Sequence, residues 1–228
     1  MRPISLTPSI NPYALGSVLV CFGQTKVHVT VCEEKSVPPF LKGTGTGWLT
    51  AEYNMLPSAT HDRSKRERQG PSGRTQEIQR LIGRSLRSCL DFSLLGERSL
   101  IVDCDVLVAD GGTRTAAISG GYVALRLGIE KLLSQGVFSA SPLVRQIAAI
   151  SVGISPEGAI IADLDYSADS QCLLDMNLVF DSFGNFIEIQ GTAEKGAFSQ
   201  EQLFKILESG KTSCEKIFQA QNLCFIKG

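Results

Sequence analysis

Residues 99–115 read SLIVDCDVLVADGGTRT, and this stretch decides the fold of the chain. From Ser99 to Val108 apolar side chains alternate with polar ones, which predicts a β-strand with one buried face. The chain then turns at the glycine pair 111–112. A long helix is predicted over residues 113–134, and it begins with small residues that permit close packing. A strand, a tight turn and a closely packed helix are therefore expected at the centre of the molecule.

Before this centre, the sequence predicts a hairpin, a strand, a loop and a helix. Residues 16–33 combine an apolar run over 17–22, a break at 23–24 and period-two alternation over 26–32, which is typical of a β-hairpin. Residues 48–53 form a further short strand. Residues 54–73 are polar and basic, without apolar periodicity, and predict a long loop of functional importance. Apolar side chains then recur at helical spacing over residues 78–90, which predicts an amphipathic helix with a cationic flank.

After the centre, the same succession of strands and helix is predicted again. Strands are expected over residues 146–154, 159–163, 176–181 and 186–190. Helical segments are expected from residue 199 to the C-terminus. Strand runs followed by helix, given twice, indicate an α+β fold in which helices pack on mixed β-sheets. Because no linker or shift in composition divides the chain, a single domain over residues 1–228 is expected.

Composition limits the possible classes of protein. The chain has 228 residues, of which 43% are apolar and 20% charged, as in ordinary globular proteins. No apolar run approaches the ~18 residues of a membrane span, and the first residues lack the apolar stretch of a signal peptide. A cytoplasmic protein without membrane contact is expected. The seven cysteines contain no C-x-x-C pair, so small buried hydrophobic residues are expected rather than disulfides or a zinc site.

The charges are unevenly distributed, although the net charge is only −1. Residues 61–87 carry eight cations against three anions, a local charge of +5. Residues 157–201 carry nine acids against one lysine, a local charge of −8. This asymmetry favours a basic surface for a polyanion and an acidic cluster that holds a metal or supplies protons. The alternative for either run is a solvated face.

The turn at residues 110–115, DGGTRT, indicates a phosphate site. Free amides at a helix start, glycines that allow an anion to come close, and the guanidinium of Arg114 together favour an anion. The turn lacks the Gly-Lys-Ser/Thr of a Walker loop, and the glycine-rich residues 43–47 fail the dinucleotide pattern because Trp48 follows. Arg74 stands near the start of the basic helix, where it can reach the same anion. The alternatives are an ordinary glycine turn with a threonine cap and a surface arginine.

Four aspartates lie within thirteen residues in the acidic region: Asp163, Asp165, Asp169 and Asp175. Two converging carboxylates bind Mg²⁺, or one of them protonates a leaving oxygen. The alternative is a solvated acidic loop. Because there are only two histidines, and His28 lies in a predicted strand, acid–base chemistry by a histidine pair is not expected. A phosphate site, a carboxylate pair and a basic strip together suggest attack of phosphate on a nucleic acid phosphodiester.

At these residues the sequence resembles the ribonuclease PH family, whose members trim RNA 3′ ends by phosphorolysis. The resemblance is strongest over residues 40–53 (FLKGTGTGWLTAEY), 73–82 (GRTQEIQRLI), 103–115 (DCDVLVADGGTRT) and 188–194 (EIQGTAE). It implies a fold like domain 2 of ribosomal protein S5, assembled as a homo-hexameric ring of three dimers.

The resemblance also implies the roles of individual residues. Inorganic phosphate, the co-substrate, would be bound by Arg74, Gly112, Thr113 and Arg114. Asp169 and Asp175 would serve as acid catalysts or as ligands of Mg²⁺. The loop arginines Arg63, Arg66 and Arg68 would hold the tRNA precursor.

These inferences favour a phosphate-dependent 3′-to-5′ exoribonuclease, a tRNA nucleotidyltransferase that releases nucleoside diphosphates. One alternative is a catalytically inactive RNA-binding ring subunit of an exosome-like assembly, and another is a hydrolytic nuclease. The joint presence of Arg114, Asp169 and Asp175 favours the enzyme, because an inactive subunit has no use for all three.

Overall fold

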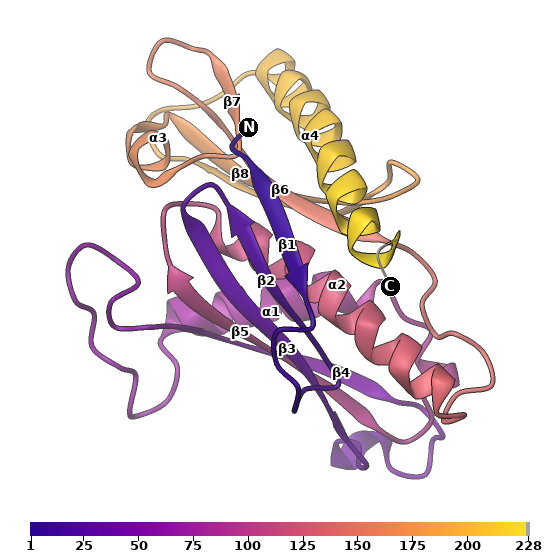
Figure 1. Ribbon diagram of the computed structural model, residues 1–228. Helices are drawn as coiled ribbons and strands as arrows, with labels where there is room; N and C mark the ends of the chain where they lie inside the picture. Colours follow the sequence, from indigo (N-terminus) through magenta and orange to yellow (C-terminus); the bar gives the residue numbers. More distant parts are fainter. Residues whose placement is uncertain (227–228) are drawn as a thin grey trace.

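The computed structural model describes residues 1–226, in which two β-sheets are joined by helices (Figure 1). The strands are β1 (Ile4–Pro8), β2 (Gly16–Phe22), β3 (Thr25–Glu34), β4 (Trp48–Met55), β5 (Ser99–Val108), β6 (Ile147–Ile154), β7 (Ile160–Ala162), β8 (Leu174–Asp181) and β9 (Phe186–Ala193). The α-helices are α1 (Gly73–Arg87), α2 (Thr113–Ser134), α3 (Tyr166–Gln171) and α4 (Gln200–Ile226). The predicted hairpin, the strand at 99–108 and the helix at 113–134 are confirmed.

The first sheet has five strands in the order β1-β2-β3-β5-β4. Its neighbours pair antiparallel except β4 and β5, which are parallel. The alternation of β3 directs Val27, Val29 and Val31 into the core, where all three are fully buried. On β5 the same period buries Val102 and Val106. The period-two pattern of the sequence therefore fixes which face of this sheet packs against the helices.

Helix α2 lies between the two sheets, and it contacts β2 and β3 on one side and β6 on the other (Figure 1). Its small residues let the sheet come close. A Cβ atom added to Gly120 would lie 2.7 Å from Cγ1 of Val20, a distance that side chains do not tolerate. Because α2 is surrounded by protein, it is apolar on nearly every face. The first residues of α2 therefore form a rigid wall of the space between the two sheets.

The second sheet has four antiparallel strands in the order β7-β6-β8-β9, and α4 packs against β6. One continuous hydrophobic cluster joins side chains of both sheets and of α2, among them Val18, Ile150 and Leu178 from the sheets and Ile118 from the helix. The helical segments predicted from residue 199 form one long helix, and the last two residues of that prediction, 227–228, lie outside the described residues.

Among the strands and α-helices, one of each was not predicted. The edge strand β1 was missed, and the segment around Asp169, predicted as a loop, contains the short helix α3. The cysteines form no disulfide within the described residues, and four of the seven are buried, but Cys32 is exposed, so the prediction of burial is wrong there. None of the helices over residues 1–226 is long and apolar enough to cross a membrane.

Candidate active site

A cavity of about 790 Å³ opens between the two sheets. Most of its wall comes from α1, the glycine turn with the start of α2, α3, β8 and β9, and single residues come from β4, the loop after it and β6. The wall includes every residue that the sequence placed at the phosphate site or in the carboxylate pair: Arg74, Gly112, Thr113, Arg114, Asp169 and Asp175. The structure thus brings together six residues that lie up to 101 positions apart in the chain.

The glycine turn owes its shape to two residues in the left-handed region. Gly111 has φ 73° and Gly112 has φ 66°, a conformation that side chains rarely adopt. Gly111 must also be small, because an added Cβ atom would lie 2.4 Å from the carbonyl oxygen of Leu164. Gly112 is the N-cap of α2, and no side chain caps this helix, so its first amides lack an acceptor within the helix at the edge of the cavity.

Thr113 is the first residue of α2, and its side chain is held by a residue of strand β4. Its hydroxyl lies 2.9 Å from the hydroxyl of Tyr53 on β4, and both side chains are buried. Burial raises the pKa of Tyr53 above its ordinary value, although the hydrogen bond from Thr113 and the nearby Arg74 and Arg114 oppose this. The phenol therefore stays protonated and orients the first turn of α2.

Arg114 is positioned by a carboxylate on the neighbouring helix. Its Nη2 atom donates to Glu77 of α1 at 2.9 Å. The other oxygen of Glu77 accepts from the amide of Gln190 on β9 at 2.8 Å. Nε of Arg114 is buried and has no partner among the described residues, so this donor is available to a ligand. Glu77 therefore links α1, α2 and β9 at the wall of the cavity.

Arg74 is the second residue of α1 and is exposed at the cavity. The start of this helix is well capped, since the Ser72 hydroxyl accepts from the Thr75 amide at 3.3 Å. Glu67 accepts from the Ser72 amide and from the Thr75 hydroxyl, each at 2.9 Å. A cation in the first turn opposes the helix dipole. The position of Arg74 in the cavity wall gives a functional reason for a cation in the first turn of α1.

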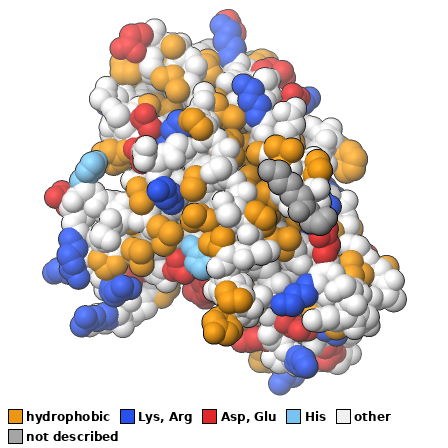
Figure 2. All heavy atoms as spheres, in the orientation of Figure 1, with side chains coloured by type: hydrophobic (Ala, Val, Ile, Leu, Met, Phe, Trp, Pro, Cys, Tyr) orange, Lys and Arg blue, Asp and Glu red, His pale blue; other side chains and the backbone are white. Residues whose placement is uncertain are grey.

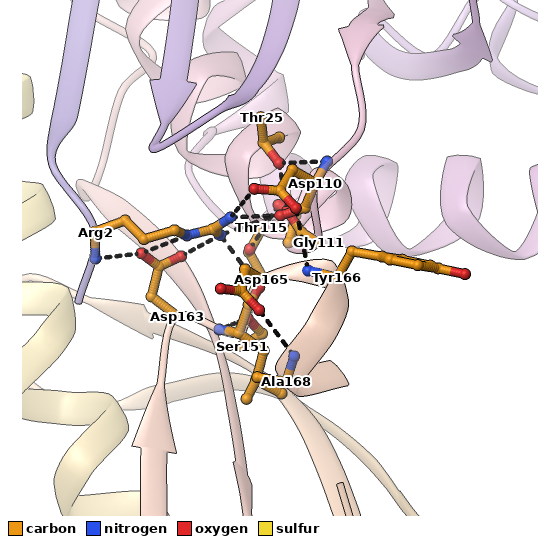
Figure 3. A network of polar contacts seen from close by, with 12 residues as sticks. Arg2, Thr25, Asp110, Gly111, Thr115, Ser151, Asp163, Asp165, Tyr166 and Ala168 are labelled. Carbon is orange, nitrogen blue, oxygen red and sulfur yellow. Dashed lines mark hydrogen bonds and ion pairs between the residues drawn. The ribbon is translucent and has the colours of Figure 1, made fainter. Parts of the chain in front are cut away.

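The four clustered aspartates divide into two structural and two pocket residues. The side chain of Asp163 is fully buried and pairs with Arg2 at 2.6 Å (Figure 3). Asp165 caps α3 by accepting from the Ala168 amide at 2.8 Å. Asp169 on α3 and Asp175 on β8 both line the cavity. The sequence could not separate these two pairs, because all four acids share one short segment.

The pKa values of both pocket aspartates are raised, mainly by burial. Partial burial raises the pKa of Asp175, and the charges of Asp169 and Glu194 raise it further, against a smaller opposing effect of Arg114. Burial also raises the pKa of Asp169, but Arg74 and Arg114 oppose this rise. Asp175 is therefore the carboxyl with fewer stabilising cations and the better placed of the two to hold a proton.

The charges along the cavity wall fit a divalent cation. Four carboxylates (Glu77, Asp169, Asp175 and Glu194) face three cations (Arg74, Arg114 and Lys195). A phosphate ion and an RNA phosphodiester would add more negative charge. Within residues 1–226 no three His, Cys, Asp or Glu side chains form a metal-binding group. Mg²⁺ typically takes one or two protein carboxylates and completes its shell with water and substrate phosphate, so the pair Asp169 and Asp175 fits it.

The basic loop over residues 56–72 lies beside this cavity. It projects from the body of the molecule, and Lys and Arg side chains gather on it (Figures 1 and 2). Arg63 and Arg66 line a second hollow of about 590 Å³, and Thr60 contributes to both cavities. Arg68 is exposed in the same loop but lines neither cavity. The loop thus presents cations at the approach to the phosphate site.

Sequence reasoning missed Glu77, Gln190 and Glu194 as site residues. Glu77 stands three positions after Arg74, a helical spacing that places both on one side of α1. Gln190 and Glu194 belong to residues 188–194, a stretch quoted for its resemblance but given no role. Helical spacing to a predicted site residue was the available signal for Glu77.

Comparison with known proteins identifies the family of this chain. Residues 1–128 match the model for domain 1 of the 3′ exoribonuclease family, and residues 145–213 match the model for its domain 2. The ribonuclease PH of Synechococcus sp. (strain JA-2-3B'a(2-13)) is 55% identical over 224 residues, covering 97% of this chain and 91% of that protein. The ribonuclease PH of Bdellovibrio bacteriovorus is 50% identical over 218 residues, covering 96% and 89%.

Solved structures share the fold at much lower identity. Rice (Oryza sativa) Rrp46 superimposes with a TM-score of 0.78 at 20% identity, covering 97% of this chain and 94% of that one. A chain of the Archaeoglobus fulgidus exosome with RNA bound to the active site has a TM-score of 0.81 at 19% identity, covering 96% and 87%. The predicted α+β fold, of the ribosomal protein S5 domain 2 type, is confirmed. By its sequence over nearly its whole length, this chain belongs to the 3′ exoribonuclease family, among the ribonuclease PH proteins.

Proposed function

We propose that the cavity is the active site of a phosphate-dependent 3′-to-5′ exoribonuclease that trims tRNA precursors and releases nucleoside diphosphates. One observation carries this proposal: a glycine turn, two arginines and a pair of aspartates with raised pKa values line a single cavity. An RNA-binding subunit without activity has no need of this combination. Membership of the 3′ exoribonuclease family supports the same reaction.

Inorganic phosphate is the proposed co-substrate, bound by Arg74, Gly112, Thr113 and Arg114. The start of α2 contributes free amides and the positive end of the helix dipole. The two guanidinium groups supply full charges and hydrogen-bond donors. Together they offset the repulsion between a phosphate ion and the phosphodiester that it must approach.

The reaction is a displacement at the terminal phosphodiester. An oxygen of the phosphate ion forms a bond to phosphorus, and the bond from phosphorus to O3′ of the penultimate nucleotide breaks. Asp175 donates a proton to this O3′, which becomes the new 3′ hydroxyl. The carboxylate then regains a proton from the phosphate-derived product or from solvent. The products are a nucleoside 5′-diphosphate and an RNA shorter by one nucleotide.

Asp169 is also the proposed ligand of Mg²⁺, and Asp175 would join it in its ionised form, after its proton has passed to O3′. When bound, the ion supplies positive charge for the phosphate oxygens and for the developing charge at the leaving oxygen. Without added positive charge the two carboxylates repel each other and the substrates. Asp169, beside Arg74 and Arg114, is the carboxylate that stays ionised to meet this need.

The RNA is proposed to reach the cavity along the basic loop, where Arg63, Arg66 and Arg68 contact its phosphates. The proposed assembly is a homo-hexameric ring of three dimers. Large apolar side chains that are exposed in the single chain support an assembly, among them Tyr13 at 96% and Phe183 at 77% exposure. A cytoplasmic location follows from the proposed tRNA precursor substrate.

Product analysis tests the function. A tRNA with a short 3′ extension is incubated with the protein and Mg²⁺, with and without phosphate. We expect nucleoside diphosphates only when phosphate is present. Nucleoside monophosphates in the absence of phosphate would indicate a hydrolytic nuclease. Binding of the RNA without any product would indicate an inactive RNA-binding subunit, and either result would overturn the proposal.

A further inference from the structure

Arg2 lies where three distant segments meet, outside the residues assigned to phosphate or proton transfer (Figure 3). Its Nε donates to Oδ2 of Asp163 at 3.0 Å, and its Nη2 donates to Oδ1 at 2.6 Å. The Arg2 backbone amide donates to the same carboxylate at 2.8 Å. The Asp163 side chain is completely buried, and that of Arg2 is 15% exposed. This is a two-pronged ion pair whose geometry admits little freedom.

The same guanidinium holds the glycine turn. Nη1 of Arg2 donates to the carbonyl oxygen of Asp110 and lies 3.8 Å from its carboxylate. Nη2 approaches the Gly111 carbonyl oxygen at 3.5 Å, and that oxygen accepts from the Thr25 hydroxyl at 2.6 Å. The Thr25 hydroxyl in turn accepts from the Asp110 amide at 2.9 Å. Arg2 and Thr25 therefore fix the two peptide groups at the centre of the turn.

Fixing these carbonyl groups fixes the amides that face the anion site. In a planar trans peptide, the C=O and the following N–H point in opposite directions. Because the carbonyls of Asp110 and Gly111 point toward Arg2, the amides of Gly111 and Gly112 point away from it. Neither amide has a hydrogen-bond partner within residues 1–226, and both glycines line the cavity. These two donors are thus held ready for a ligand.

The pairing of Arg2 with Asp163 also holds the segment of chain that leads to Asp169. Asp163 has φ 64°, a strained conformation for a residue with a side chain, and its amide donates to the Ser151 carbonyl at 2.7 Å. The next residue, Leu164, gives its carbonyl oxygen to Nη2 of Arg2 at 3.2 Å. Asp165 then caps α3, the helix that carries Asp169.

We propose that Arg2 is a positioning residue for phosphorolysis. By gripping the glycine turn and the Asp163 segment at once, it sets the distance between the phosphate-binding amides and Asp169. This inference rests on the proposed function of the cavity. Arg2 does not line the cavity itself. Its effect is to keep the phosphate donors and the carboxylate pair in one arrangement before RNA arrives.

Steady-state kinetics of Arg2→Lys test the proposal. Lysine keeps the charge next to Asp163 but cannot bridge the carboxylate and the turn carbonyls together. We expect the KM for phosphate to rise about tenfold, with the KM for RNA nearly unchanged. Arg2→Met should raise the KM for phosphate more than Arg2→Lys does, so that lysine partly rescues the loss of the arginine. Thr25→Val removes the other grip on the Gly111 carbonyl and should raise the same KM while the Asp163 ion pair stays intact.

Arg98→Lys is the matched control. Arg98 also joins a carboxylate to a backbone carbonyl, since it donates to Glu33 at 2.6 Å and to the Leu95 carbonyl at 2.7 Å. None of these three residues lines the cavity. We expect Arg98→Lys to lower the melting temperature as Arg2→Lys does, with no change in the KM for phosphate.

The possible outcomes distinguish a failure of the role proposed for Arg2 from a failure of the function proposed for the cavity. If Arg2→Lys and Thr25→Val lower only the melting temperature or the active fraction, as the control does, Arg2 has a merely structural role and the proposal is overturned. If the wild-type protein itself releases no nucleoside diphosphate, the proposed function fails before Arg2 is tested. If Arg2→Met does not fold, Arg2→Lys and Thr25→Val still decide the question through the KM for phosphate.

Discussion

Arg114 is the most constrained cation of the cavity, because Glu77 holds one of its nitrogens while Nε remains free for a ligand. Arg114→Lys keeps the charge but loses the planar fork. We expect the KM for phosphate to rise at least about tenfold, as expected for loss of a charge-assisted hydrogen bond. Initial rates against phosphate concentration at saturating RNA measure the effect. Arg80→Lys, an exposed change on α1 away from the cavity, should leave that KM unchanged.

Asp175 is expected to be required for turnover and to lower the free energy of unfolding of the protein. Asp175→Asn should lower kcat by about 100-fold or more, the usual contribution of a general acid, while RNA affinity persists. Equal loss of RNA binding would contradict this role.

The same variant should be more stable than wild type at pH 7, by up to about 1 kcal/mol, because a repelled carboxylate is removed. The pKa of Asp175 is raised in the folded state. Wild type therefore regains stability relative to the variant as the pH falls through the raised pKa of the folded state to below the ordinary aspartate pKa, where the carboxyl is protonated in both states. Chemical denaturation at two pH values measures the difference, and a gap that widened at low pH would refute the raised pKa.

Glu194 sets the pH dependence of turnover through its charge. Glu194→Gln removes a negative charge that raises the pKa of both Asp169 and Asp175. The Asp175 pKa should therefore fall, and the protonated acid should be lost at lower pH. We expect the alkaline limb of the kcat profile to move to lower pH. Glu208→Gln on α4, also exposed, is the matched control and should leave the profile in place.

The arginines and aspartates that line the cavity could be predicted from sequence, whereas the residues that hold them in place could not. Arg114, Asp169 and Asp175 lie in local patterns of glycine, charge and spacing. The pairs Arg2 with Asp163 and Glu77 with Gln190 join positions 161 and 113 residues apart. No local pattern specifies such partners, because only the packing of the two sheets brings them together.

At the scale of elements, the two misses have physical causes. β1 is a five-residue edge strand that ends in Pro8 and pairs with β2 alone, and its alternation is limited to two apolar residues, Ile4 and Leu6, which is too short to indicate a strand. α3 has six residues and none of them is buried, so it has no apolar stripe to detect. Its start depends on the cap from Asp165. The long elements were predicted well because each buries a whole face, as β5 and α2 do.

The basic loop between β4 and α1 is expected to govern RNA affinity without affecting phosphate. Alanine at Arg63, Arg66 and Arg68 together should weaken RNA binding and reduce the slope of its salt dependence, by up to about three ion contacts. The KM for phosphate should stay the same. Filter binding at several salt concentrations measures the slope. Lys216→Ala on α4 is the control, and a slope equal to that of the control would show that the loop does not contact RNA phosphates.

At the scale of the whole molecule, α2 is packed between both sheets, and one hydrophobic cluster spans them. We therefore propose that residues 1–228 fold as a single domain. Thermal unfolding should show one cooperative transition, with calorimetric and van't Hoff enthalpies in agreement. Two separable transitions, one for each sheet, would contradict this proposal.

The exposed apolar side chains predict that the chain does not remain a monomer. Tyr13, Phe183 and Phe40 are 96%, 77% and 68% exposed in the single chain. Sedimentation velocity of the full chain should give the mass of a hexamer. A monomer at all accessible concentrations would contradict the ring and would leave these surfaces unexplained.

The central claim is that a phosphate ion in the cavity is the nucleophile. The most direct test supplies radiolabelled orthophosphate with unlabelled RNA and follows the label. If phosphate attacks the terminal phosphodiester, the released nucleoside diphosphate carries the label in its β-phosphate, and Arg114→Lys releases labelled product only at much higher phosphate concentrations. If shortened RNA accumulates while the label stays in orthophosphate, water is the nucleophile, and the phosphorolytic account of this cavity is wrong.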